Sequence, residues 1–181
     1  MKLVSIEKAR NMLTIQSVVY QLARGVDRMD DALIRDCFWP DATDDHGLYR
    51  GSAMGFVDWV LPLLAQMQRT QHIIGNVLID IAGTNAWCES YFQAYHQLEQ
   101  SDGQSDMYAA GRYLDLFELR NHEWRIIHRQ VVYDWNRNEA SSSSWDVSPM
   151  KDMLQRGERA THDLSYQDLA SNRKAILSED I

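Results

Sequence analysis

The chain has 181 residues, 45% of them hydrophobic, which is enough apolar material for the core of one globular domain. Its 26 acidic and 18 basic side chains give a formal net charge of −8, which argues against a surface that follows nucleic-acid phosphates. Two isolated cysteines without a C-x-x-C motif argue against a disulfide scaffold and against a zinc finger. Because of the negative net charge, we expect no nucleic-acid partner.

The opening segment, MKLVSIEKARNMLTIQ, carries charges at Glu7, Lys8 and Arg10, where a signal peptide needs an unbroken apolar stretch. No window of the sequence approaches the ~18 apolar residues that a membrane span requires. Together with the isolated cysteines, which are typical of a reducing compartment, these features predict a cytoplasmic protein without a membrane partner.

The first predicted element is an amphipathic helix, since apolar residues recur at helical spacing from Met12 to Leu22. Gly25 is expected to end this helix as a left-handed cap, with Asp27 following at once. A second, short helix is predicted over residues 30–38, before Pro40.

A short extended piece, ATDDHGLYRG, leads to Ser52, the expected N-cap of a third helix with an apolar side. Pro62 is expected to kink or divide that helix. From Thr70 the hydrophobic period changes from 3.6 to 2, as strands require. Four strands are predicted, joined by short polar connectors: 71–82, 85–99, 106–120 and 123–136. Helices followed by an antiparallel meander make an α+β fold, since no helix intervenes to make the strands parallel.

The composition changes after Trp135 to NRNEASSSSWDVSPMKD, where four consecutive serines and Pro149 indicate a loop or linker. The segment that follows has charged residues throughout and only scattered apolar anchors. We predict one domain over residues 1–138, followed over 139–181 by a linker and a tail that packs on the domain or on a neighbouring subunit.

Four segments together resemble a known family: LARGVDRMDDALIRDCFWPDA, GLYRGSAMGFVDWV, QHIIGNVLIDIAGTNAWCESYFQAYHQ and GRYLDLFELRNHEWRIIHRQVVYDW. They are similar to the SnoaL-like branch of the nuclear-transport-factor-2-like superfamily, which includes scytalone dehydratase and hexachlorocyclohexane dehydrochlorinase. The resemblance implies a cone-shaped barrel, in which a strongly bent antiparallel or mixed sheet wraps around three N-terminal helices. The same cone hosts many reactions and also non-enzymes, so the reaction must be argued from the site.

In these relatives a histidine on a strand is the base and an aspartate after the first helix holds it. By position, the resemblance carries these roles over to His72 and Asp27. A carboxylate on one imidazole nitrogen fixes the tautomer that leaves the other nitrogen free to accept a proton. The alternatives are a strand-end histidine bound to backbone and an aspartate that caps the next helix.

The resemblance also places Arg129 where dehydrochlorinase-like proteins carry an arginine, which could stabilise a departing anion. Alternation along the strand puts Arg129 on one face with Tyr133 and leaves His128 on the other. The alternative role is a salt bridge to Asp115 or Asp134.

Three polar residues on strands are candidates for binding substrate. Tyr95 and His96 are adjacent and point to opposite faces, so only one of them can line the cavity unless a bulge intervenes. In the simpler interpretation Tyr95 is half-buried and His96 is exposed. Asn76 lies four residues after His72, on the same face by alternation, where its amide could bind a substrate oxygen; otherwise it is a polar group at an edge.

Other candidates come from the helices and loops. His46 could reach the mouth of the cone, and a pocket lined with Trp39, Phe56, Trp59 or Tyr113 would suit an aromatic or cyclic substrate. Aromatic residues at such spacings also form ordinary core. The histidines show no H-E-x-x-H spacing, and no glycine-rich phosphate loop or G-x-S-x-G motif is present. We expect no metal and no cofactor.

The leading hypothesis is a cofactor-independent lyase acting on a small hydrophobic, aromatic or cyclic molecule, from which water, halide or a carbonyl fragment departs. The same base would serve a lyase that releases formaldehyde from diaryl compounds, or an isomerase like ketosteroid isomerase. The competing class is a non-catalytic binding module or structural subunit, like the small subunit of ring-hydroxylating dioxygenases, which shares this cone. Relatives of this kind are trimers or dimers, so we expect a homo-oligomer.

Overall fold

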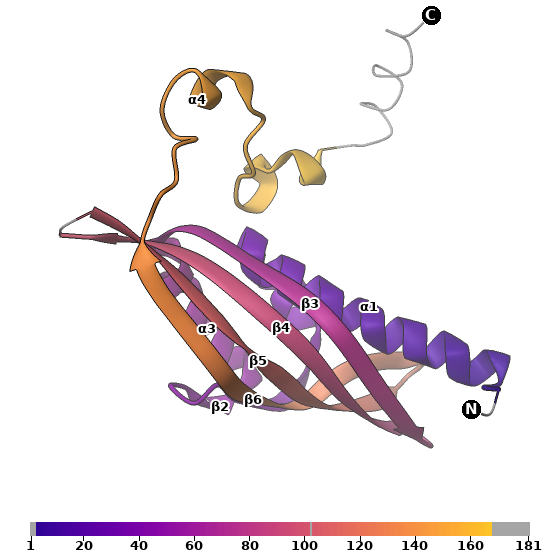
Figure 1. Ribbon diagram of the computed structural model, residues 1–181. Coiled ribbons are helices and arrows are strands. Elements are labelled where there is room, and N and C mark those ends of the chain that lie inside the picture. The colour runs from indigo at the N-terminus through magenta and orange to yellow at the C-terminus, as the bar shows by residue number, and fades with distance from the viewer. Residues whose placement is uncertain (1–2, 102, 168–181) are drawn as a thin grey trace, which may run out of the picture.

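A computed structural model describes residues 3–101 and 103–167 of the chain. The fold is built from a long first helix, two shorter helices and a six-stranded sheet (Figure 1). In chain order the elements are α1 (Ile6–Arg28), α2 (Asp31–Asp36), β1 (Phe38–Asp45), β2 (Arg50–Ser52), α3 (Ala53–Ala65), β3 (Met67–Ala82), β4 (Asn85–Gln100), β5 (Gly103–Arg120), β6 (Glu123–Ala140) and α4 (Met150–Met153), with single 3-10 turns at Ala160–His162 and Leu164–Tyr166. The α+β class predicted from the sequence is confirmed.

The strand order in the sheet is β2-β1-β6-β5-β4-β3, and β3 to β6 form the predicted antiparallel meander. The sheet is mixed because β1 pairs with β6 in parallel, and it is open rather than closed into a barrel. The expectation of antiparallel pairing rested on strands that follow one another directly. It does not apply to β1 and β6, since a helix and four strands lie between them in the chain.

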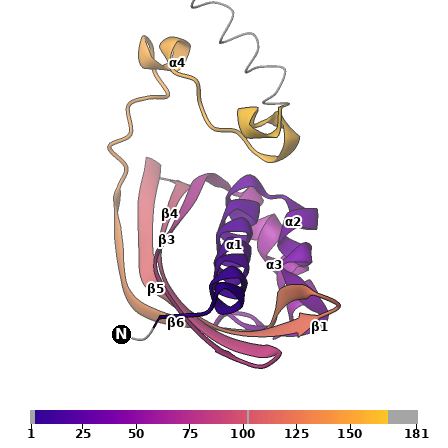
Figure 2. The same ribbon diagram turned by 90° about the vertical axis from the view of Figure 1, so that its right-hand side faces the viewer.

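The strongly curved sheet wraps around α1, and α2 and α3 lie at the open side of the curve (Figure 2). The core forms where the inner face of the sheet meets the helices. Ile15 and Leu22 of α1 are buried there together with Phe38 of β1, Phe117 of β5 and Ile126 of β6. This arrangement leaves the C-terminal end of α1 against β3, where the candidate site lies.

The first helix does not end at Gly25, as predicted, but continues to Arg28, and Met29 takes the left-handed conformation with φ 54°. The glycine serves close packing instead, because a Cβ at this position would lie 2.9 Å from Cγ1 of Ile34 in α2. Asp27 is therefore part of the last helical turn and is buried. In α3, Ser52 is the N-cap as predicted, but Pro62 does not divide the helix.

Strand β3 contains a register shift between Ile74 and Val77. Just before it the more buried residues are even-numbered, Thr70, His72 and Ile74, and after it the more buried positions are odd-numbered, from Val77 onward. A β-bulge has this effect because an extra residue on one strand moves later side chains to the other face. The bulge therefore decides which side chains after His72 face the cavity.

The segment after β6 lies beyond one end of the sheet and returns to α1 (Figure 1). Arg28 of α1 pairs with Asp163 at 3.0 Å, and the Tyr166 hydroxyl donates a 2.7 Å hydrogen bond to Asp30. Strand β6 runs to Ala140, two residues past the predicted end of the domain. The predicted tail includes residues 168–181, which lie outside the described residues.

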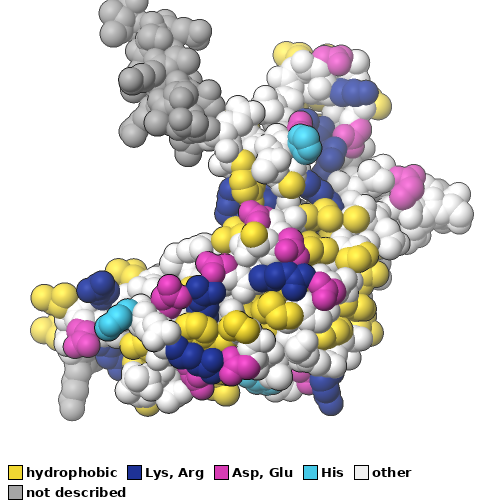
Figure 3. Space-filling model, turned by 180° about the vertical axis from the view of Figure 1, so that it is seen from behind, with side chains coloured by type: hydrophobic (Ala, Val, Ile, Leu, Met, Phe, Trp, Pro, Cys, Tyr) yellow, Lys and Arg dark blue, Asp and Glu magenta, His cyan; other side chains and the backbone are white. Residues whose placement is uncertain are grey.

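On the face of the molecule in Figure 3, acidic and basic side chains are interspersed among hydrophobic ones. Within the part of the chain that the structure describes, no helix combines the length and the apolar character that a membrane crossing requires.

One ion pair is buried inside the sheet. Arg129 of β6 and Asp115 of β5 are paired across the two strands. The guanidinium of Arg129 donates two hydrogen bonds of 2.7 Å to the carboxylate of Asp115. Asp115 is fully buried and Arg129 nearly so. Removal of one charge from such a pair leaves the other buried without compensation, which is strongly destabilising.

We expect Gly111→Ala to lower the stability of the fold, because β5 and β6 approach closely at this position, next to a register shift. A Cβ on Gly111 of β5 would lie 2.0 Å from the carbonyl oxygen of Val132 in β6, and backbone cannot move aside as a flexible side chain can. Overpacking of this kind typically costs about 1–3 kcal/mol, which thermal denaturation followed by circular dichroism would measure. Gly75→Ala is the matched control, because its Cβ would make only ordinary contacts of 3.7 Å or more; equal losses in both variants would contradict the packing argument.

We expect Asp115→Asn to lower the free energy of unfolding by about 3–5 kcal/mol, because the Arg129 guanidinium then stays buried without its counter-charge. Chemical denaturation would measure the loss. Glu123→Gln removes the partner of Arg125 in an ion pair of 2.7 Å whose acid is exposed, and should cost less than about 1 kcal/mol. A loss for Asp115→Asn no larger than that of this control would show that the pair is not a buried structural element.

Candidate functional site

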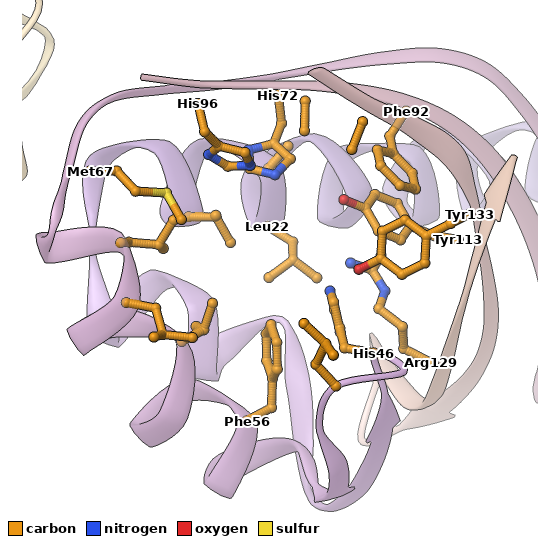
Figure 4. A pocket seen from close by; sticks show the side chains of 18 of the residues that line it. Leu22, His46, Phe56, Met67, His72, Phe92, His96, Tyr113, Arg129 and Tyr133 are labelled. Atoms are coloured by element: carbon orange, nitrogen blue, oxygen red, sulfur yellow. The ribbon is translucent and has the colours of Figure 1, made fainter. Parts of the chain in front are cut away.

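A cavity of about 220 Å³ lies between the inner face of the sheet and the helices (Figure 4). Most of its wall is apolar. Side chains of this kind include Leu22, Phe56, Trp59, Val60, Met67 and Phe92. The polar side chains that reach it are few, and histidines are prominent among them: His46, His72 and His96, with Arg129, Tyr113 and Tyr133.

Asp27 and His72, 45 residues apart in the chain, are in contact. One carboxylate oxygen of Asp27 lies 2.7 Å from Nδ1 of His72, and the other accepts a 2.9 Å hydrogen bond from the backbone N–H of the same residue. Their side chains are only 10% and 11% exposed. Because Nδ1 faces the carboxylate and the ring lines the cavity, Nε2 is the nitrogen available to a ligand, and no described residue hydrogen-bonds it.

His96 lies beside His72, with the two ring centroids 5.4 Å apart in an edge-to-face arrangement. Its Nδ1 lies 2.7 Å from the hydroxyl oxygen of Thr70. Burial, together with the nearby His72 and Arg159, lowers the pKa of His96 to about 4, so this imidazole is neutral at neutral pH. The expectation that His96 is exposed was wrong, since the β4 alternation turns it inward and leaves it buried.

Two predicted substrate-binding residues lie outside the cavity. Tyr95 is on the outer face of β4, opposite to His96, and its hydroxyl donates a 2.9 Å hydrogen bond to Asp106. Asn76 is exposed because the bulge between Ile74 and Val77 interrupts the alternation that would have placed it beside His72. Neither residue is retained as a candidate.

Arg129 reaches the cavity, but it is not a free cation. Its guanidinium is held by Asp115 and lies over the ring of Tyr113, 4.0 Å from the ring centroid, whereas Asp134 pairs with Arg112. Burial alone would lower the pKa of Arg129, but attraction and hydrogen bonds from Asp115 outweigh it and raise that pKa above its ordinary value. Arg129 therefore contributes a fixed positive charge to this wall.

The candidates His46, Phe56, Trp59 and Tyr113 all line the cavity. Burial raises the pKa of the Tyr113 phenol, which therefore stays protonated. Trp39 does not reach the cavity, because it packs in the core and its indole N–H donates to the carbonyl of Glu118.

Sequence reasoning missed a second histidine–carboxylate contact. His46 Nδ1 lies 2.5 Å from an oxygen of Asp44, whose side chain is completely buried. Asp44 is next to last in β1 and His46 follows the strand directly. The spacing of two residues at the end of an extended segment is the signal that could have revealed the contact. Strand alternation puts Tyr133 on the same face as Arg129, but Tyr133 was not named as a site candidate. Its side chain also lines the cavity.

Other reactive groups give little chemistry here. Among the described residues, no three His, Cys, Asp or Glu side chains are grouped so that they could hold a metal ion. Cys37 and Cys88 are buried, and burial raises the pKa of each thiol to about 12, so neither is a thiolate nucleophile at neutral pH. The histidines of the cavity are left as the groups that can exchange protons.

Several solved structures share this fold. A hexachlorocyclohexane dehydrochlorinase of type 2 is 18% identical with a TM-score of 0.65, over 75% of this chain and 93% of that one. A candidate scytalone dehydratase from Novosphingobium aromaticivorans is 15% identical with a TM-score of 0.64, over 76% and 93% of the two chains. At these identities the likeness shows the fold alone. No curated protein matches the chain significantly in sequence.

The family is shown by the sequence itself. The model of the SnoaL-like domain matches residues 7–130, which is well over half of the chain. The matched range includes both members of the Asp27–His72 contact, and it ends within β6, before Tyr133. This match leads to one conclusion: the chain belongs to the SnoaL-like domain family.

Proposed function

We propose that this protein is a cofactor-independent lyase in which His72, held by Asp27, removes a proton from a small apolar substrate. The observation that carries the proposal is the contact of both Asp27 oxygens with His72 at the wall of a mostly apolar cavity. An imidazole so oriented offers Nε2 to the cavity, and the carboxylate stabilises the imidazolium that forms after proton transfer. A positioned base of this kind typically contributes about 10²–10⁴ in rate.

The reaction class that we propose is elimination. His72 takes a proton from carbon or hydroxyl, the electrons of that bond form the new double bond, and the leaving group departs with the electrons of its own bond. Arg129 stabilises the negative charge that develops, since its charge is fixed by Asp115 before the reaction begins. The names of the fold neighbours, a dehydrochlorinase and a candidate dehydratase, support water or halide as the leaving group.

The size and lining of the cavity support a substrate with a single substituted ring. An engineered apolar cavity of about 150 Å³ holds benzene, so a cavity of about 220 Å³ has room for a ring with substituents. Phe56, Trp59 and Tyr113 present flat faces to such a ring. This volume favours a one-ring compound over the diaryl compounds considered among the alternatives.

A general test of the base uses 5-nitro-1,2-benzisoxazole, whose ring opens when a base removes the proton on C3 and the N–O bond breaks to give a coloured cyanophenolate. We expect His72→Ala to lower kcat/KM by about 10²–10⁴, and Asp27→Asn to lower it by a smaller factor, because the ring remains but its tautomer is no longer fixed. Absorbance at the product band measures the rate.

His122→Ala is the control variant, because His122 stands exposed in the turn between β5 and β6 and does not line the cavity. Circular dichroism must show that each variant is folded. Turnover by folded His72→Ala at the rate of the unaltered protein would contradict the proposed base and would favour a non-catalytic cone. If His72→Ala does lose activity, assays of chloride release from hexachlorocyclohexane and of scytalone dehydration would choose between the leaving groups.

A further inference from the structure

A second histidine faces the cavity from a different wall than His72. His46 lies in the turn after β1, where Asp44 near the end of that strand holds its Nδ1 at 2.5 Å. Figure 4 shows His72 and His96 together on one side of the cavity and His46 on another, close to Arg129. A substrate inside the cavity would therefore lie between two imidazoles, each with a carboxylate behind it.

The orientation of His46 is set by three contacts. Its ring stacks on Phe56, with centroids 4.2 Å apart and planes 15° from parallel. Its backbone N–H donates to the carbonyl of Tyr49 at 2.8 Å, which closes the turn, and Asp44 holds one ring nitrogen. Nε2 is left for the cavity, and no described residue hydrogen-bonds it.

Asp44 is an unusual residue to bury. Its side chain has no exposure, and its Oδ2 has no hydrogen-bond partner among the described residues. A buried, partly unsatisfied carboxylate is costly to the fold, so it calls for a role beyond packing. Its neighbour in register on β6 is Arg129, but that guanidinium is already bound by Asp115. The imidazole of His46 is the group that Asp44 contacts directly.

The other polar groups of the cavity are poor proton donors. Arginine is not deprotonated in proteins, so Arg129 supplies charge and no proton. The imidazole of His96 is neutral and shares the wall of His72. Burial raises the pKa of both Tyr113 and Tyr133, which makes these phenols weaker acids than in water. His46 is the remaining group with an oriented nitrogen on another wall.

We propose that His46, oriented by Asp44, is the acid that gives a proton to the leaving group while His72 removes one from the substrate. The inference rests on the proposed function and adds the acid to its base. For a hydroxyl leaving group, the protonated His46 donates its Nε2 proton as the bond to the leaving group breaks, so that neutral water departs; a halide is too weakly basic to take the proton and would leave as an anion hydrogen-bonded to His46. The ring ends neutral with its remaining proton on Nδ1 toward Asp44, and solvent then returns a proton to His46 and removes one from His72.

A series of leaving groups tests this role. In the opening of 1,2-benzisoxazole the leaving 2-cyanophenolate is the more basic of the two leaving groups and gains more from a proton, whereas the nitro group of the 5-nitro compound stabilises the phenolate charge, so that proton transfer helps it less. We expect His46→Gln to lower kcat/KM about tenfold or more for 1,2-benzisoxazole and much less for the 5-nitro compound. Asp44→Asn should likewise lower kcat/KM more for 1,2-benzisoxazole than for the 5-nitro compound, because it leaves the imidazole without its orienting carboxylate.

His128→Gln is the matched control: His128 is on the neighbouring strand β6, where its Nδ1 contacts the hydroxyl of Thr43 outside the cavity, and the variant should leave both rates unchanged. If His46→Gln is folded and slows both compounds by the same factor, its role is structural and the inference is wrong. If Asp44→Asn does not fold, the result of His46→Gln decides alone. If the unaltered protein and His72→Ala have the same kcat/KM, the proposed function itself is wrong. The two failures are therefore distinguishable.

Discussion

The candidate site depends on how one carboxylate holds one residue. Asp27 binds His72 at two atoms, the backbone nitrogen and the ring nitrogen Nδ1. The backbone bond anchors the last turn of α1 to the start of β3, and the ring bond orients the imidazole. Helix position and base orientation are thus coupled, and a shift of α1 along the sheet would change the chemistry of the cavity.

The rest of the cavity keeps charge in fixed places. Asp115 holds Arg129 inside the sheet, Asp44 holds His46 at the turn after β1, and burial keeps His96 and Tyr113 neutral. Each carboxylate is behind the group that it orients, so the cavity wall itself presents imidazoles, a guanidinium and aromatic rings. In an apolar cavity such prearranged groups act more strongly on developing charge than they would in water.

Much of this could be predicted from the sequence, because the relevant patterns are local. Helical spacing, the Ser52 cap and the strand alternation predicted the α+β elements, and the family resemblance placed Asp27 beside His72, a contact that the structure contains. The misses have long-range or subtle causes. Parallel pairing of β1 with β6 joins distant strands, and the bulge that exposes Asn76 leaves no clear mark in the alternation. The catalytic roles that we give Asp27 and His72 are proposals.

The most direct test of the central claim is the position of the proton on His72. Long-range ¹H–¹⁵N correlation spectra of the labelled protein distinguish the two nitrogens of each neutral imidazole, and His72→Gln assigns the signals. The account predicts that neutral His72 carries its proton on Nδ1, toward Asp27, with Nε2 unprotonated, and that Asp27→Asn weakens this preference. A neutral His72 protonated on Nε2 would contradict the account, because that nitrogen then has no lone pair with which to accept a substrate proton.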